Sequence, residues 1–232
     1  MNAALILART DSKRLPNKAI ENVGGKKLIQ WCIDGIINTG VLTPIIVTTD
    51  RPVDDPLIEI ATQNQIKYFR GSTHNIAKRI YDCINFFNID IFARINGDSP
   101  FINRKLIQEA LDILNDQQEI EFVTNLIPRR FPYGLSVEML RSDVYKKHYS
   151  KINTPEFQEH VTTWFYQNPD QVKTYTLNYK YGNDHHLRFV VDTYEDRDAI
   201  EQFILKNPSF DFYNTPLEEL VKRYKNTITT NK

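Results

Sequence analysis

The sequence has few cysteines and no net charge. Its 232 residues include two cysteines, and its 29 lysines and arginines are balanced by 29 aspartates and glutamates. Cys32 and Cys83 both lie in apolar segments of helical character without metal-ligand spacing. We therefore expect two buried thiols in a reducing compartment rather than a disulfide or a catalytic pair. Because the formal charge is zero, no overall field attracts nucleic acid, and local clusters must carry any anion binding.

Several familiar patterns are also missing. No apolar run is long enough to cross a bilayer, and no basic region precedes an apolar core of signal length, so we expect a cytoplasmic protein without a membrane partner. No fixed-period repeat or low-complexity tract occurs, which excludes solenoids and disordered scaffolds. The chain has neither G-x-x-x-x-G-K-[ST] nor a G-x-G-x-x-G after its first strand. It is therefore no ordinary P-loop or dinucleotide-binding protein.

What the chain does contain is an alternation of short apolar runs with segments of helical period. This alternation predicts one α/β domain over residues 1–232, with a mostly parallel central sheet flanked by helices. The region around 129–170 is less regular. The expected strands lie at residues 3–8, 44–47, 67–69, 90–95, 122–124, 135–140 and 187–191. The later expected helices include one that begins at Pro155 and stops near Pro169, and a last one after Thr215.

Basic residues follow the first apolar run directly. Four cations lie in this loop: Arg9, Lys13, Arg14 and Lys18. The carboxyl ends of parallel strands are where open α/β sheets bind ligands, and cations gathered there could converge on a polyanion. The natural candidate is a nucleoside triphosphate. The polar segment Asn96–Pro100, after the expected strand 90–95, is a second loop that we expect to be functional.

The basic loop also carries a family pattern. From Ala8 to Lys18 it reads A-R-x-x-S-x-R-L-P-x-K, and Gly24-Gly25-Lys26 follows. This opening resembles the cytidylyltransferases that activate acidic sugars, and it is closest to the branch of the spore coat polysaccharide protein SpsF, with acylneuraminate and Kdo cytidylyltransferases as relatives. Other segments resemble that branch in order: Thr48–Asp50, Phe69–Ser72, Arg94–Pro100, Phe131–Glu138, Glu159–Thr162 and Leu187–Thr193.

The chain departs from this branch at three positions beside the basic loop. Asp11 and Asn17 stand where the branch usually has glycine, and Leu7 stands where glutamine is common. These differences affect the expected loop geometry and nucleotide choice more than the fold.

The resemblance implies a Rossmann-like nucleotide-diphospho-sugar transferase fold. It also implies Mg²⁺-dependent transfer of CMP from CTP to an acidic sugar, or to a small phosphorylated or phosphonate acceptor, with release of pyrophosphate in surface polysaccharide biosynthesis. The implied partners are CTP, an anionic acceptor and a second copy of the chain, with residues 129–170 binding the acceptor and forming the dimer interface.

Roles for individual residues follow from the same resemblance. Arg9, Arg14 and Lys18 would neutralise the departing pyrophosphate, whereas Lys13 would face solvent. Two carboxylates at strand ends, Asp98 and Asp192, would hold Mg²⁺, and Asp98 is counted with the three cations as catalytic. The expected nucleotide-binding residues are Leu7, Ala8, Arg9, Ser12, Arg14, Lys18, Thr48, Thr49, Ser72, Arg79, Asn96 and Gly97. The expected acceptor-binding residues are Arg129, Arg130, Tyr133, Glu138, His160 and Arg188.

Several of these residues also fit structural roles. Asp98 lies among turn formers, and Asp192 precedes a possible capping box of Thr193 with Asp196. His160 is a candidate general base, but it could equally be a structural histidine. The pair His185-His186 lacks the spacing of zinc ligands.

Two other function classes stay open at this point. A nucleotide-sugar-dependent glycosyltransferase can share a similar nucleotide-binding fold, but its products would not include pyrophosphate. A non-catalytic nucleotide-binding protein would bind nucleotide without turnover on any acceptor.

Overall fold

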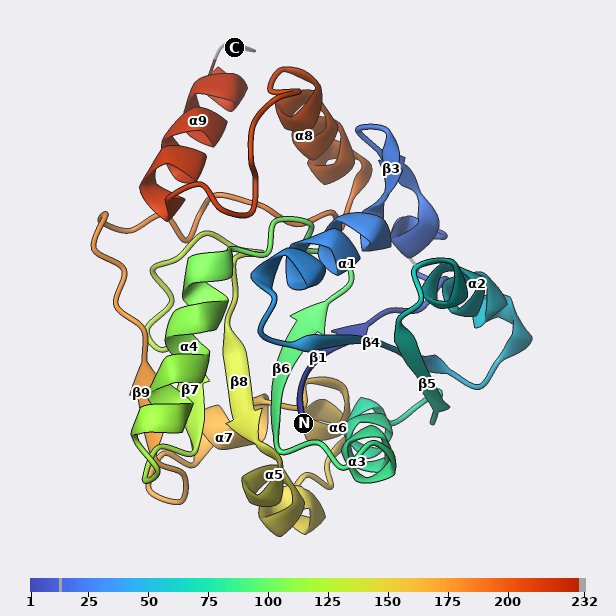
Figure 1. The fold of residues 1–232 in the computed structure, drawn as a ribbon, viewed down its shortest axis with the longest axis vertical. Coiled ribbons are helices and arrows are strands. Elements are labelled where there is room, and N and C mark those ends of the chain that lie inside the picture. The colour runs from blue at the N-terminus through green and yellow to red at the C-terminus, as the bar shows by residue number, and fades with distance from the viewer. Residues whose placement is uncertain (13, 230–232) are drawn as a thin grey trace.

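A computed structural model describes residues 1–12 and 14–229, so the expected exposure of Lys13 lies outside the described residues (Figure 1). The central sheet has seven strands in the order β5-β4-β1-β6-β8-β7-β9. Their bounds are β1 Asn2–Leu7, β4 Thr43–Thr49, β5 Lys67–Gly71, β6 Ile91–Asn96, β7 Phe122–Thr124, β8 Glu138–Arg141 and β9 Thr174–Thr176. A two-stranded hairpin consists of β2 Asn22–Val23 and β3 Lys26–Lys27.

The sheet is mostly parallel, as the sequence predicts. β1 pairs in parallel with both β4 and β6, and β4 with β5. β8 is antiparallel to β6 and β7, while β7 and β9 are again parallel. The parallel half therefore brings the carboxyl ends of β1, β4 and β6 to one edge, where a ligand site is expected.

Helices cover both faces of the sheet (Figure 1). One face packs against α1 Leu28–Thr39, α2 Asp55–Gln63, α4 Arg104–Asp116, α8 Tyr194–Leu205 and α9 Leu217–Thr229. The other packs against α3 Ile76–Phe86, α5 Ser142–His148, α6 Pro155–Glu159 and α7 Thr163–Gln167. Alternate residues of β1 serve the two cores: Ala4 and Ile6 face the first, and Ala3 and Leu5 the second. β1 therefore lies buried on both faces at the centre of the fold.

Each core contains one of the chain's two tryptophans. Trp31 of α1 is 6% exposed and donates from Nε1 to the carbonyl of Val23 at 2.8 Å. Trp164 of α7 is 4% exposed and stacks on the imidazole of His148, with 4.8 Å between ring centroids. Cys32 and Cys83 are buried free thiols, as expected.

His148 is a buried histidine whose two ring nitrogens have no hydrogen-bond partner in the described part of the chain. Burial lowers its pKa below the usual value, and the charges of Lys151 and Lys147 add to this. The folded protein therefore keeps the ring neutral at pH values where the unfolded chain takes up a proton. The stability contribution of the neutral ring is present above about pH 6.5 and is lost as the pH falls.

We expect His148→Phe to raise the free energy of unfolding by about 1 kcal/mol at neutral pH, because phenylalanine keeps the stack on Trp164 and removes two unsatisfied polar atoms. The gain should be larger at pH 5.5 than at pH 7.5. Urea unfolding at both pH values measures it, with the exposed His74→Gln as control. A gain that does not depend on pH would contradict the assignment of a neutral buried ring.

The structure overturns two expected elements. Residues 187–191 form only an isolated parallel bridge, between Arg188 and Tyr133, and no strand. Their backbone hydrogen bonds go to loops: Phe189 donates to the Tyr133 carbonyl at 2.7 Å and Val191 to that of Asp98 at 2.9 Å. The expected helix from Pro155 to near Pro169 is two short helices. His160 leaves the helical conformation between them, which lets the Thr162 hydroxyl reach Glu138 at 2.5 Å.

Asn17 adopts the left-handed backbone conformation, with φ of 58°. Glycine and asparagine are the residues that enter this region most readily, so asparagine is compatible with a position where the resemblance leads us to expect glycine. We expect Asn17→Gly to change the free energy of unfolding by less than about 0.5 kcal/mol and Asn17→Val to lower it by about 1–2 kcal/mol. Urea unfolding of both variants measures this. A fully stable Asn17→Val would mean that the loop has another conformation.

Candidate functional site

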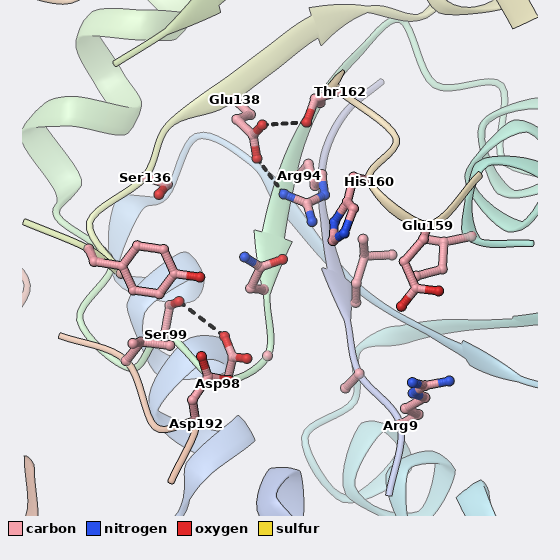
Figure 2. A pocket seen from close by; sticks show the side chains of 18 of the residues that line it. Arg9, Arg94, Asp98, Ser99, Ser136, Glu138, Glu159, His160, Thr162 and Asp192 are labelled. Carbon is pink, nitrogen blue, oxygen red and sulfur yellow. Dashed lines mark hydrogen bonds and ion pairs between the residues drawn. The ribbon is translucent and has the colours of Figure 1, made fainter. Parts of the chain in front are cut away.

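A cavity of about 510 Å³ lies at the carboxyl ends of β1 and β6 (Figure 2). Most residues that the sequence predicts for nucleotide, metal and acceptor line it. They are Leu7, Ala8, Arg9, Ser12, Arg14, Lys18, Arg79, Asn96, Gly97, Asp98, Arg129, Tyr133, Glu138, His160 and Asp192. The two polar loops that follow β1 and β6 therefore meet at one site, because the two strands are parallel neighbours.

Lys18 joins the two predicted metal ligands. Its Nζ lies 2.7 Å from Asp98 Oδ2 and 2.9 Å from Asp192 Oδ1. Burial alone lowers the pKa of Lys18, but the charges and hydrogen bonds of the two carboxylates more than offset this and raise the pKa above its usual value. Arg14 Nη2 adds a longer contact of 3.3 Å to Asp192. The two carboxylates thus converge on one cationic position.

Asp192 is held in place by the start of α8. Thr193 and Asp196 form the capping box that the sequence predicts, and Asp196 Oδ2 also accepts from the backbone N–H of Asp192 at 3.0 Å. Arg188 lies outside the cavity lining and forms an ion pair with Asp196 at 2.6 Å. Burial raises the pKa of Asp196, but the hydrogen bonds from Arg188 and the backbone outweigh it and lower the pKa. Arg188 therefore supports the Asp192 loop from behind.

The start of the basic loop is anchored by a buried carboxylate that the sequence analysis missed. Asp54 is fully buried and accepts from the backbone N–H of Thr10 at 2.7 Å and from its hydroxyl at 2.9 Å. Asp11 forms an ion pair with Arg51 at 2.6 Å and lies 3.5 Å from Arg9. In the sequence, Asp54 precedes Asp55 and Pro56, which predict the start of a helix. Asp54 therefore resembles a helix-capping residue and gives no sign of its contact with the basic loop.

Arg79 of α3 is a buried cation at the edge of the cavity. It is 2% exposed, and its Nε donates to the carbonyl of Ser72 at 2.9 Å. Among the described residues no carboxylate lies within ion-pair distance of it. Burial, with a further contribution from the charge of Arg9, lowers the pKa of Arg79 to about 10. The positive charge of this guanidinium is therefore not neutralised by a neighbouring carboxylate of the described residues.

Other predicted binding residues do not reach the cavity. Thr48 and Thr49 are fully buried, and the Thr49 hydroxyl donates to Asp54. The Ser72 hydroxyl accepts from the backbone N–H of Asn75 at 3.2 Å, at the start of α3. Arg130, like Arg188, is absent from the cavity lining. Residues at the end of a strand can point to either side of the sheet edge. Their position in the sequence therefore does not distinguish residues that contact a ligand from residues that have a structural role.

The cavity lining at its other end includes Arg94 and Ser136, which were not among the predicted binding residues. Arg94 Nη1 donates to Glu138 Oε2 at 2.5 Å, and the other oxygen of Glu138 accepts from the Thr162 hydroxyl (Figure 2). The hydroxyl of Tyr166 donates to that same oxygen. Burial opposes both charges, but their mutual attraction outweighs it, so the pKa of Arg94 is raised and that of Glu138 is lowered. The sequence signal that could have identified Arg94 is a charged residue within an apolar strand.

Two glycines allow the backbone to close around the cavity. A Cβ on Gly97 would lie 2.9 Å from the Cβ of Ala8, so β1 and the loop after β6 can approach closely only with glycine there. Gly134 has φ of 100°, and a Cβ on it would lie 2.2 Å from the carbonyl oxygen of Phe189. Both positions bring predicted binding loops into contact.

No helix in the described residues is long and apolar enough to cross a membrane.

Comparisons with known proteins agree on one family. A family model described as cytidylyltransferase matches residues 3–229. A solved cytidylyltransferase structure from Leptospira borgpetersenii superposes with a TM-score of 0.90 at 27% identity, covering 98% of this chain and 95% of that one. The spore coat polysaccharide biosynthesis protein SpsF of Bacillus subtilis is 24% identical, over 87% of this chain and 85% of its own. A 3-deoxy-manno-octulosonate cytidylyltransferase of Ruthia magnifica is 24% identical, over 92% and 89%.

Proposed function

Because the chain belongs to the cytidylyltransferase family, we propose that this nucleotidyltransferase transfers CMP from CTP to an anionic acceptor and releases pyrophosphate. The acceptor class is an acidic sugar or a small phosphorylated or phosphonate compound. The similarity to SpsF supports a role in surface polysaccharide biosynthesis. The name of the Ruthia relative gives 3-deoxy-manno-octulosonate, a sugar acid, as its substrate. The observation that carries the proposal is the convergence of Lys18, Asp98 and Asp192 at the end of a cavity lined by further arginines.

In the proposed reaction an acceptor oxygen attacks the α-phosphorus of CTP. An ionised phosphate or phosphonate oxygen needs no base, whereas a sugar hydroxyl would give its proton to a base, for which His160 in the cavity lining is the candidate. The bond from the α-phosphorus to the oxygen bridging the α- and β-phosphates breaks, and pyrophosphate departs with the bonding electrons. Arg9, Arg14 and Lys18 would bind the β- and γ-phosphates, and their attraction strengthens as charge develops on the leaving group. Arg79, which has no carboxylate within ion-pair distance in the described part of the chain, would contact the nucleotide at the α3 side of the cavity.

The donor set at Asp98 and Asp192 fits Mg²⁺. Their oxygens already surround one cationic group, and Mg²⁺ is commonly held by one or two carboxylates together with substrate phosphates. When bound there, Mg²⁺ would stabilise negative charge on the phosphate oxygens. Lys18, released from the carboxylates, would then be free to bind the triphosphate. Arg188 and Asp196 would keep Asp192 oriented.

Calorimetric titration with CTP, UTP, ATP and GTP, each with and without Mg²⁺, tests the nucleotide half of the proposal without knowledge of the acceptor. Selective, Mg²⁺-enhanced CTP binding is the expected result. Folded protein that binds none of the four would contradict the site assignment. Pyrophosphate release in an acceptor screen distinguishes this enzyme from a glycosyltransferase, and CTP binding without turnover on any acceptor favours a non-catalytic nucleotide-binding protein.

The homodimer is also part of the proposal, with residues 129–170 as its interface. Light scattering coupled to size-exclusion chromatography measures it directly.

A further inference from the structure

The Glu138 end of the cavity presents an arginine whose hydrogen bonds are incomplete. Arg94 lies on β6, on the face where Phe92 belongs to the second core, and its side chain is 16% exposed. Nη1 is engaged by Glu138, but Nε is buried without a partner, and Nη2 donates to no other described residue. A buried guanidinium with unused donors is costly unless water or a ligand completes its hydrogen bonds.

Glu138 cannot itself serve as that ligand contact. It is 3% exposed, and both of its oxygens are occupied, one by Arg94 and the other by Thr162 and Tyr166. A buried carboxylate that already accepts three hydrogen bonds, one of them from a guanidinium, is a poor metal ligand and a weak base. Its role is to fix the direction in which the Arg94 guanidinium points.

We propose that Arg94 selects the acceptor by donating from its guanidinium to a carboxylate of that molecule, and that Glu138, Thr162 and Tyr166 position it. This inference rests on the proposed function, which supplies an anionic acceptor. Arg129 lines the same cavity, and its buried Nη1 has no hydrogen-bond partner among the described residues. Its guanidinium carbon lies 4.9 Å from the centroid of the Tyr133 ring.

The charges at this end favour a carboxylate over a phosphate. Arg94 pairs with Glu138, and Arg129 and Glu159 line the same cavity, so these four side chains carry no net charge. A dianionic phosphate would bring an additional negative charge toward Glu138. In Figure 2 Arg94, Glu138 and Thr162 lie at one end of the cavity and Asp98 and Asp192 at the other, so an acceptor held at Arg94 would extend toward the metal ligands.

The test uses the Nε–H resonances of arginine in the full-length protein saturated with CTP. The Arg94 signal is assigned by its loss in Arg94→Lys, and the probes are acetate and inorganic phosphate. We expect acetate to shift the Arg94 signal in a saturable way, with phosphate shifting it less. The internal control is Arg141, whose guanidinium donates to the backbone carbonyls of Ile120 and Leu114 outside the cavity.

Each outcome decides the proposal. An Arg94 signal unmoved by both anions overturns the role of Arg94, and a signal that responds to phosphate but not to acetate overturns the carboxylate assignment. Tyr166→Phe removes one hydrogen bond from Glu138 and is expected to weaken acetate binding several-fold while leaving CTP affinity unchanged. An unchanged acetate response would remove the positioning role of Tyr166 and Glu138. CTP binding, measured on the same samples, separates these failures from failure of the proposed function.

Discussion

Replacing Asp98 with asparagine is expected to lower the rate of CTP-dependent turnover by about 100- to 1,000-fold, with little change in the fold. Asparagine has nearly the same shape, but it removes one of the two negative charges that converge on Lys18 and would hold Mg²⁺. Stability should change little, because Asp192 still pairs with Lys18. Pyrophosphate release measures turnover, and the Mn²⁺ affinity of the CTP complex, by electron paramagnetic resonance, measures the metal site directly.

Lys18→Met is the informative companion to Asp98→Asn. It should also reduce turnover, because a phosphate-binding cation is lost. Its effect on the metal should be opposite, however: removing Nζ from between the two carboxylates is expected to raise the Mn²⁺ affinity of the nucleotide-free protein. If both variants weaken Mn²⁺ binding, the carboxylates do not form the metal site in the way proposed.

Removing the negative charge of Glu138 is expected to have the largest effect on stability. Glu138→Leu leaves the Arg94 guanidinium in the protein interior without its counter-ion, and breaking a buried ion pair in this way costs about 3–5 kcal/mol. For a chain of this length each kcal/mol corresponds to about 2–4 °C in Tm. A fall of roughly 10 °C is therefore expected in calorimetry.

The double variant Arg94→Met with Glu138→Leu is the matched control. Both charges are then absent, and the free energy of unfolding should recover most of the loss, because apolar residues of similar volume often replace a buried pair without penalty. Both Glu138 variants leave the hydroxyls of Thr162 and Tyr166 without their acceptor, so the difference between them isolates the ion pair. Additive effects of the two single changes would mean that the pair is not coupled.

The sequence predicts the parallel half of the fold and the gathering of residues at the Asp98 end of the cavity. Strand β1 and the loop after it are local signals: an apolar run followed by cations and then by proline. Asp98 and Asp192 could be found because each follows an apolar run in a recognisable motif, although only the run before Asp98 forms a strand. Lys18 meets them because β1 and β6 are neighbours in a parallel sheet, and α/β alternation already implies such a sheet.

The Glu138 end of the cavity was less predictable, since it depends on long-range partners. Arg94 and Glu138 are 44 residues apart and meet through the antiparallel pairing of β6 with β8, which no local period reveals. The interruption of the helix at His160 also depends on a long-range partner, because the Thr162 hydroxyl donates to Glu138 where a continuous helix was expected. Thr48 and Thr49 were predicted to bind nucleotide because they end a strand. The strand is present in the structure, but both side chains are buried.

The placement of the two tryptophans gives the protein separate optical reporters for its two helical layers. Trp164 belongs to α7, directly after the segment that supplies His160 and Thr162 to the cavity, whereas Trp31 lies across the sheet under the β2–β3 hairpin. Fluorescence of a Trp31→Phe variant would therefore follow the cavity layer alone, and that of Trp164→Phe the opposite layer. Ligand-induced change on one side of the sheet can be observed without labelling the protein.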